Sequence, residues 1–177
     1  MVASTGAFAP TVIDSAVLDI DEIVGRVEGY HPDADVGLIR RAYHFSQFAH
    51  REQTRKSGDP FFIHPARVAS IITDLRLDTA SVCAGLLHDV IEDTDTTYDE
   101  LVHEFTKEIA DLVMEVTHEG TNYRDYYFPR LESRKGIMIQ FADRLSNMAR
   151  MRDWPGDVQQ WFLDDSCYWR KSPMEMA

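Results

Sequence analysis

Residues 78–94 read DTASVCAGLLHDVIEDT and predict the central helix of a helical domain. Asp78 is a typical N-cap residue, and we expect the helix to run from it through Val90. The middle of this helix, Val82–Leu87, is apolar on nearly every face, which places it inside the domain. The pair His88-Asp89 follows directly, and burying both groups is costly unless each is paired or ligated. This stretch therefore predicts a core helix with a polar site at its end.

Apolar residues recur at helical spacing on both sides of this segment, and no segment has the alternating pattern of a strand. Gly29 and Pro32 end the first helical run, and His64-Pro65 opens another because proline favours the first helical position. We expect helices at residues 15–29, 36–53, 64 onward, 97–105, 107–117, 131–152 and 157–170, with loops at 54–62 and 118–129. Together they predict one all-α domain, a helical bundle over residues 13–172 with short tails at 1–12 and 173–177.

The composition is that of an ordinary globular protein with a large negative charge. The 177 residues are 44% apolar and 27% charged, with a net charge of −12 and a pI near 4.9. A general nucleic-acid binder needs a basic surface, so this charge argues against that class. No apolar stretch approaches the ~20 residues that span a bilayer, and the N-terminus lacks the pattern of a signal peptide. We expect a cytoplasmic protein that binds neither nucleic acid nor a membrane.

Three separate segments carry side chains suited to a metal site. These residues are His64, His88, Asp89 and Asp143. Two imidazoles and two carboxylates can surround one divalent ion, and helix neighbours differ in direction by only about 100°. Manganese, iron, cobalt, nickel and zinc all accept such ligands. Glu92 and Asp93 follow about one helical turn later, where a carboxylate can orient or deprotonate water that such an ion activates. The combination indicates phosphoester hydrolysis.

Three segments of the chain resemble the hydrolase domain of the RelA/SpoT-type alarmone enzymes, a branch of the HD phosphohydrolases. They are RKSGDPFFIHP at 55–65, AGLLHDVIEDT at 84–94 and FADRLSNM at 141–148, in this order. The resemblance extends from about residue 36 to 153 and implies a stand-alone small alarmone hydrolase with an HD-domain helical bundle. It also implies that the four candidate ligands hold Mn²⁺ and that Glu92 and Asp93 are catalytic.

The resemblance further implies a set of nucleotide-binding residues. They are Arg51, Arg55, Lys56, Ser57, Asn147 and Trp161. Arg55 would stack on or bond to the base, with Lys56 beside it, and Asn147 shares a helix face with Asp143 four residues earlier. Two assignments stay open: Arg51 can meet a phosphate or a neighbouring carboxylate, and Trp161 can pack in the core or beside the nucleotide.

Several positions depart from the family pattern. Ser146 replaces a common histidine, Gln140 a frequent lysine and Thr106 the usual glycine, while Ala149-Arg150 replaces Arg-Thr. The expected metal and water residues are intact. The departures therefore leave the nucleotide pocket, and with it the exact substrate, open.

The function that the resemblance implies is removal of the 3′-pyrophosphate from the guanosine alarmone (p)ppGpp, giving GDP or GTP in the stringent response. Two alternatives remain. The same chemistry can act on the 2′-phosphate of NADPH or on an adenine alarmone, or the chain can bind the alarmone without catalysis, as a regulator. All six expected metal and water residues are present, which favours an enzyme.

Overall fold

The computed structural model describes residues 19–55, 58–117, 131–151, 154–160 and 162–164. Within these ranges the chain is helical, and its one extended pairing is an isolated bridge between Thr54 and Pro60. The helices with defined bounds are α1 (Ile20–Tyr30), α2 (Val36–Ala49), α3 (Ile63–Asp74), α4 (Thr79–Leu87), α5 (Val90–Asp93), α6 (Tyr98–Glu104), α7 (Lys107–Val116) and α9 (Arg134–Met148). Residues 156–160 and 162–164 are also helical. The predicted all-α class is confirmed.

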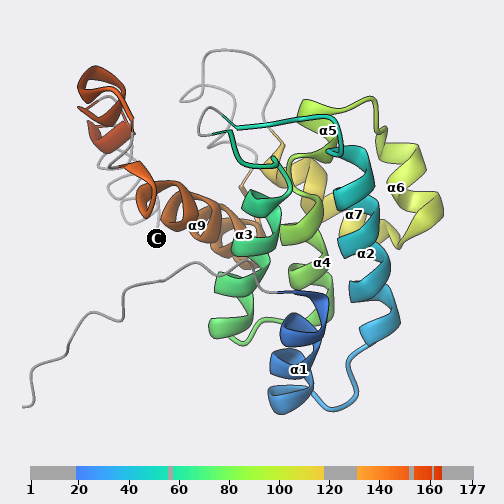
Figure 1. Cartoon of the computed structure of the whole chain (residues 1–177). Coiled ribbons are helices and arrows are strands. Elements are labelled where there is room, and N and C mark those ends of the chain that lie inside the picture. Colours follow the sequence, from blue (N-terminus) through green and yellow to red (C-terminus); the bar gives the residue numbers. More distant parts are fainter. Residues whose placement is uncertain (1–18, 56–57, 118–130, 152–153, 161, 165–177) are drawn as a thin grey trace, which may run out of the picture.

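Helix α4 forms the centre of the bundle and packs against α2, α3, α7 and α9 (Figure 1). Its residues from Val82 to Leu87 are all buried, as the sequence predicted. Gly85 allows α3 to approach closely, because a Cβ atom there would lie 2.3 Å from Ile72 Cδ1. This complete burial leaves His88, at the end of α4, inside the domain.

The helix starts predicted at Asp78 and Thr97 are confirmed. The Asp78 carboxylate accepts a hydrogen bond from the Ser81 amide at 3.0 Å, and the Thr97 hydroxyl accepts one from the Glu100 amide at 3.2 Å. Amides in the first turn of a helix have no partner within the helix, so these side chains supply hydrogen bonds that the amides would otherwise lack.

The predicted continuation of the central helix to Val90 is wrong. Helix α4 ends at Leu87, and a separate turn of helix, α5, begins at Val90. The His88 ring explains the break, because its Nδ1 lies 2.9 Å from the carbonyl oxygen of Gly85. A continuing helix would offer that oxygen to the amide of Asp89 instead. The break places the acidic pair that follows on a short helix of its own.

Three other predicted helices are longer than the observed ones. Helix α1 begins at Ile20 instead of residue 15, because its N-cap Asp19 has extended backbone and its side chain accepts hydrogen bonds from the amides of Asp21 and Glu22. Helix α2 ends at Ala49 instead of Gln53, because the amides of Arg51 and Gln53 bond to carbonyl groups three residues back, as in turns. Helix α9 begins after its N-cap, Ser133, and ends at Met148, short of the predicted residue 152. The early end of α2 leaves His50–Gln53 as a turn that leads into the loop before α3.

The loop before α3 is ordered by its own backbone, as predicted. The Arg55 amide bonds to the Asp59 carbonyl at 2.9 Å, and the Gly58 amide bonds to the Arg55 carbonyl at 2.8 Å. Gly58 has a φ of 86°, in the left-handed region that glycine enters without steric cost. This turn presents the Arg55 side chain to α9, where it meets Asn147.

No helix in the described ranges is long and apolar enough to cross a membrane. The expected tails at 1–12 and 173–177, the loop at 118–129 and the end of the helix at 157–170 lie outside the described residues. The expected domain limits at residues 13 and 172 lie outside them as well.

Candidate metal centre

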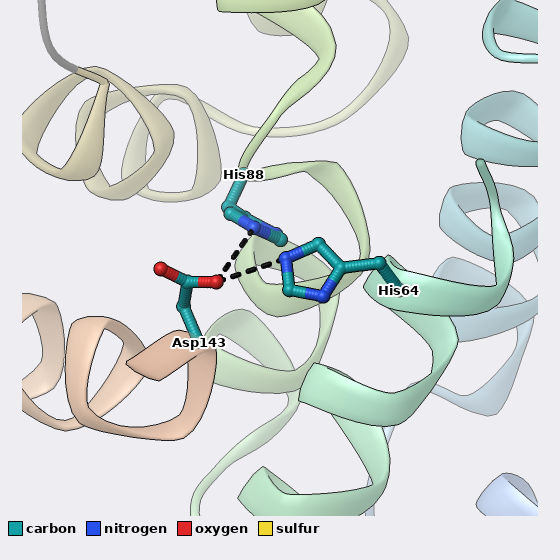
Figure 2. Close-up of side chains that lie close together, drawn as sticks. All are labelled: His64, His88 and Asp143. Atoms are coloured by element: carbon teal, nitrogen blue, oxygen red, sulfur yellow. Dashed lines mark ion pairs between the residues drawn. The ribbon is translucent and has the colours of Figure 1, made fainter. Parts of the chain in front are cut away.

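The structure brings the four residues predicted as metal ligands together from three segments. His64 lies in the first turn of α3, Asp143 lies within α9, and His88-Asp89 forms the link between α4 and α5. They meet because α3 and α9 both pack against α4 and against each other. Figure 2 shows the side chains of His64, His88 and Asp143 turned toward a common point.

One carboxylate oxygen lies between the two imidazoles. Asp143 Oδ1 is 2.8 Å from His64 Nε2 and 3.8 Å from His88 Nε2. Asp89 joins the same group, with Oδ1 2.9 Å from His88 Nε2 and Oδ2 3.7 Å from His64 Nε2. Candidate ligand atoms of the two histidines and Asp143 all lie within 4.8 Å of one another. Atoms at these separations can surround one ion at about 2.0–2.2 Å each.

Hydrogen bonds on the far side of each ring turn Nε2 toward the carboxylates. His88 Nδ1 donates to the Gly85 carbonyl, and because a carbonyl only accepts, the proton of the neutral ring is on Nδ1. His64 Nδ1 is hydrogen-bonded to the Ser146 hydroxyl at 3.1 Å. Such contacts orient metal-binding histidines in general. His88 Nε2 is buried and faces the carboxylates of Asp89 and Asp143, so this donor set fits a divalent metal ion.

The carboxylates beside His88 change its charge. Burial lowers the pKa of His88, but the carboxylates of Asp89 and Asp143 raise it more, to about 9. Burial raises the pKa of Asp89, but its interaction with His88 outweighs this and holds the pKa well below its usual range. With no ion bound, His88 is therefore a cation paired with the Asp89 carboxylate at neutral pH. A metal ion and a proton compete for this ring.

Side chains on α9 hold the Asp143 carboxylate in place. Asn147 Nδ2 donates to Asp143 Oδ1 at 2.8 Å, and Gln140 Nε2 lies 3.5 Å from Oδ2. Asn147 Oδ1 in turn accepts from an Arg55 guanidinium nitrogen at 3.2 Å. Two residues predicted to contact the nucleotide, Arg55 and Asn147, are thus joined to each other and to the metal centre.

Three arginines lie near one another, and the sequence analysis missed two of them as site residues. They form the guanidinium cluster of Arg55, Arg67 and Arg150. Arg150 pairs with Asp59 in the loop before α3. Burial lowers the pKa of Arg67, and the positive charges of Arg150 and Arg55 lower it further, whereas the Asp59 carboxylate raises it. The available signal was that Arg67 follows His64 by three residues, about one helical turn.

Glu92 and Asp93 lie on α5, exposed, at the wall of a cavity of about 720 Å³. The wall is formed by the end of α2, by α5 and the residues after it, and by α6, and it is strongly acidic. Among the residues that the structure describes, its charged side chains are Glu52, Glu92, Asp93, Asp95 and Glu100, with Arg51 as the one base. None of the guanidinium cluster lines this cavity, although Arg55 is close enough to Asp93 for that carboxylate to raise the Arg55 pKa.

Arg51 belongs to the acidic side. Its guanidinium lies 4.1 Å from the centre of the Phe48 ring, and Nη2 is 3.6 Å from Glu52 Oε1. Of the two alternatives left open for Arg51, the contact seen is the one with a neighbouring carboxylate. The other predicted substrate residues, Lys56, Ser57 and Trp161, lie outside the described residues.

Comparison with known proteins indicates the family of the chain. A family model described as an HD domain matches residues 42–124. The chain is 39% identical over 137 residues to a GTP pyrophosphokinase of Myxococcus xanthus, covering 69% of this chain and 18% of that protein. It is 40% identical over 119 residues to a guanosine-3′,5′-bis(diphosphate) 3′-pyrophosphohydrolase of Aquifex aeolicus, covering 62% of this chain and 17% of that protein. The chain thus spans roughly a fifth of the length of these relatives.

Among solved structures, the chain is similar to a metazoan ortholog of SpoT, a protein that hydrolyses ppGpp. The TM-score is 0.62 at 24% sequence identity, and the match covers 70% of this chain and 78% of the other. At this identity the likeness concerns the fold, and it agrees with the HD-domain match.

Proposed function

Because this chain belongs to the HD-domain family, in its RelA/SpoT-type branch, we propose that it removes the 3′-pyrophosphate from (p)ppGpp. The products are pyrophosphate and GDP or GTP. The observation that carries the proposal is the convergence of His64, His88, Asp89 and Asp143 in one shielded site. The imidazoles are 6% exposed and the carboxylates 16% and 17%, which leaves an open side for a substrate oxygen, as a catalytic site requires.

Mn²⁺ is the proposed ion, held by the two histidines and the two aspartates of this site. Carboxylate ligands suit manganese, and the imidazoles also suit iron, cobalt, nickel and zinc. When bound, the ion polarises a phosphoryl oxygen and lowers the pKa of water at the site. The chain itself supplies orientation, because Ser146, Asn147 and the Gly85 carbonyl hold the ligand side chains in place.

Glu92 and Asp93 are proposed to handle the proton of the attacking water. A carboxylate in reach of that water accepts its proton as the oxygen bonds to the 3′-linked phosphorus. The bond from this phosphorus to the ribose 3′-oxygen breaks, and that oxygen takes a proton from solvent to become the 3′-hydroxyl, while the carboxylate returns its own proton to solvent. Both residues form the wall of an open cavity, which gives the proton a route out. The Asp93 amide bonds to the Asp89 carbonyl at 2.9 Å, and this bond ties α5 to the ligand segment.

The guanidinium cluster is proposed to hold the nucleotide. Arg55 Nη2 donates a hydrogen bond to Asn147 Oδ1. Arg55 Nη1 is buried and has no hydrogen bond among the described residues, so this donor is available to the nucleotide. The chain carries a net charge of −12, which repels a polyanionic nucleotide. Three adjacent guanidinium groups supply the local positive field that offsets this repulsion.

A parallel substrate assay tests the proposal and its alternatives. The purified full chain is incubated with Mn²⁺ and, in separate reactions, ppGpp, pppGpp, NADPH and an adenine alarmone. We expect pyrophosphate release from the guanosine alarmones with the highest kcat/KM. Faster orthophosphate release from NADPH would replace the substrate assignment, and ppGpp binding without turnover would indicate a regulator.

Two substitutions separate metal binding from proton transfer. Asp89→Asn removes a ligand charge, so we expect loss of bound Mn²⁺ and of activity. Glu92→Gln should retain Mn²⁺ and lower kcat by about 10²- to 10⁴-fold, the usual contribution of a general base. Glu52→Gln, on the same cavity wall, is the matched control and should behave as wild type. Full activity in Glu92→Gln would remove that residue from the mechanism.

A further inference from the structure

The turn after α2 contains a chain of hydrogen bonds that ends on α5. His50 is 1% exposed, and its Nδ1 lies 2.8 Å from Gln53 Oε1. Gln53 Nε2 donates to the carbonyl oxygen of Asp93 at 2.5 Å, across 40 residues of sequence. This His50–Gln53 pair therefore connects a buried ring to the backbone of the helix that carries the acidic residues.

The chemistry of these groups permits one arrangement. A carbonyl oxygen only accepts, so the NH₂ group of Gln53 faces Asp93 and its Oε1 faces His50. Because Oε1 also only accepts, the neutral His50 ring carries its proton on Nδ1. The amide of Gln53 is thus held at both ends, by a buried ring on one side and by α5 on the other.

The pair is also fixed to the ligand side of the site. The His50 ring stacks on Phe61, with centroids 4.7 Å apart and planes at 26°. The Phe61 amide bonds to the Gln53 carbonyl at 3.0 Å, and the Phe61 ring meets His64 edge-on at 6.5 Å. The same unit therefore contacts the segment that carries a metal ligand and the segment that carries the acidic residues.

Helix α5 needs such an anchor. It is four residues long, it has no side-chain N-cap, and its two acidic residues come at its C-terminal end. A single helical turn is marginal in water, and negative charge at a helix C-terminus opposes the helix dipole. The bond from Gln53 satisfies one of the terminal carbonyl groups that such a short helix leaves without a partner.

We propose that His50 and Gln53 are positioning residues that hold α5, and with it Glu92 and Asp93, in register with the metal ligands. The effect on turnover rests on the proposed hydrolase function, whereas the clamp itself is a property of the fold without metal or substrate. Loss of the clamp is expected to lower kcat by about 10- to 100-fold, because small displacements of catalytic groups have effects of this size. KM should change less than kcat, since Gln53 bonds directly to α5, whereas Arg55 meets the pair only through the Phe61 ring, 5.5 Å from its guanidinium.

The test compares Gln53→Met, which keeps the side-chain length without either hydrogen bond, with His50→Phe, which keeps the ring stacking without the Nδ1 donor. Glu52→Gln, between them in sequence, is the control. For each full-length protein we would measure kcat, KM and Mn²⁺ affinity, together with amide hydrogen exchange of residues 90–96 without metal or substrate. We expect faster exchange in this segment, lower kcat, a smaller change in KM, and unchanged Mn²⁺ affinity in both variants. The double variant should be no worse than Gln53→Met, because the two residues act as one unit.

Exchange at residues 90–96 that equals wild type in both single variants would overturn the clamp, and so would wild-type kcat despite faster exchange. A loss that appears only in KM or in Mn²⁺ affinity would also overturn it, because a positioning role changes kcat. If Gln53→Met does not fold, Gln53→Asn and His50→Phe give the same comparison. A wild-type protein that releases no pyrophosphate would contradict the proposed function, while the exchange rates would still decide whether His50 and Gln53 hold α5.

Discussion

Ser146 shows how a small side chain acts on the metal centre. It is buried, and its hydroxyl lies 3.1 Å from His64 Nδ1 although the two residues are 82 positions apart. From the sequence, Ser146 stood out only as a departure from the family pattern, and we attributed that departure to the nucleotide pocket. The structure places it behind a candidate ligand instead, where it determines how the His64 ring is oriented.

We predict that Ser146→Ala weakens Mn²⁺ binding by about 10- to 100-fold, the usual cost of losing a hydrogen bond that orients a ligand. The reason is that His64 Nδ1 loses its partner and the ring is no longer held. Isothermal titration calorimetry measures the effect. Ser46→Ala is the matched control, because Ser46 is a buried serine whose hydroxyl has no hydrogen bond among the described residues. Equal affinities in the two variants would contradict the role of Ser146.

The raised pKa of His88 predicts that metal binding depends on pH. The pKa is about 9 in the absence of metal, above its usual value, so below that pH each ion has to displace one proton. Affinity for Mn²⁺ should therefore increase about tenfold per pH unit between about pH 6 and 8, and level off near pH 9. Calorimetry in buffers of different ionisation enthalpy counts the protons released. A pH-independent affinity would show that His88 is neutral before the metal binds.

At the scale of the elements, helix caps account for most of the agreement between the predicted and observed helices. Asp78 and Thr97 begin helices where expected, because capping depends on residues three positions apart. The end of α4 was not predictable in the same way. An apolar run and a following histidine are compatible with a continuous helix, and the bond from the His88 ring to the Gly85 carbonyl, which accompanies the break, depends on the fold.

The start of α4 allows a cap to be compared with an ion pair. Asp78 caps the helix and also lies 2.6 Å from Lys135 Nζ, with side chains 41% and 37% exposed. An exposed ion pair contributes little, so we expect Asp78→Ala to lower the free energy of unfolding by about 1 kcal/mol, mostly through the cap. Asp78→Asn keeps a capping oxygen and should be close to wild type. Chemical denaturation distinguishes the cap from the ion pair. An equal loss of unfolding free energy in both variants would show that the ion pair dominates.

At the scale of the whole molecule, charge is distributed unevenly around the metal centre. The chain is strongly acidic, and the cavity beside α5 shares this character, whereas the guanidinium cluster is basic. The cluster comes from three segments: the loop before α3, α3 itself and the turn after α9. Such an arrangement favours approach of a polyanion from the basic side.

We predict that Arg150→Gln raises KM for ppGpp about fivefold, equivalent to about 1 kcal/mol, and reduces its dependence on salt. Removing one of three positive charges weakens the attraction for the nucleotide but leaves the metal ligands in place. Arg150→Lys retains the charge and serves as the control. Steady-state kinetics over a range of ionic strength measures both effects, and a KM that does not change in Arg150→Gln would exclude the cluster from substrate binding.

Local sequence was sufficient for the helical class, for most helix starts and for the chemical identity of the candidate ligands. Capping residues, the apolar run of Val82–Leu87 and the ligand types are properties of short segments, which is why they are readable without the fold. The meeting of His64 with Asp143, the place of Ser146 and the guanidinium cluster depend instead on how α3, α4 and α9 pack. Those contacts join residues far apart in sequence. The spacing of residues within one helix carries no information about the distance between two helices.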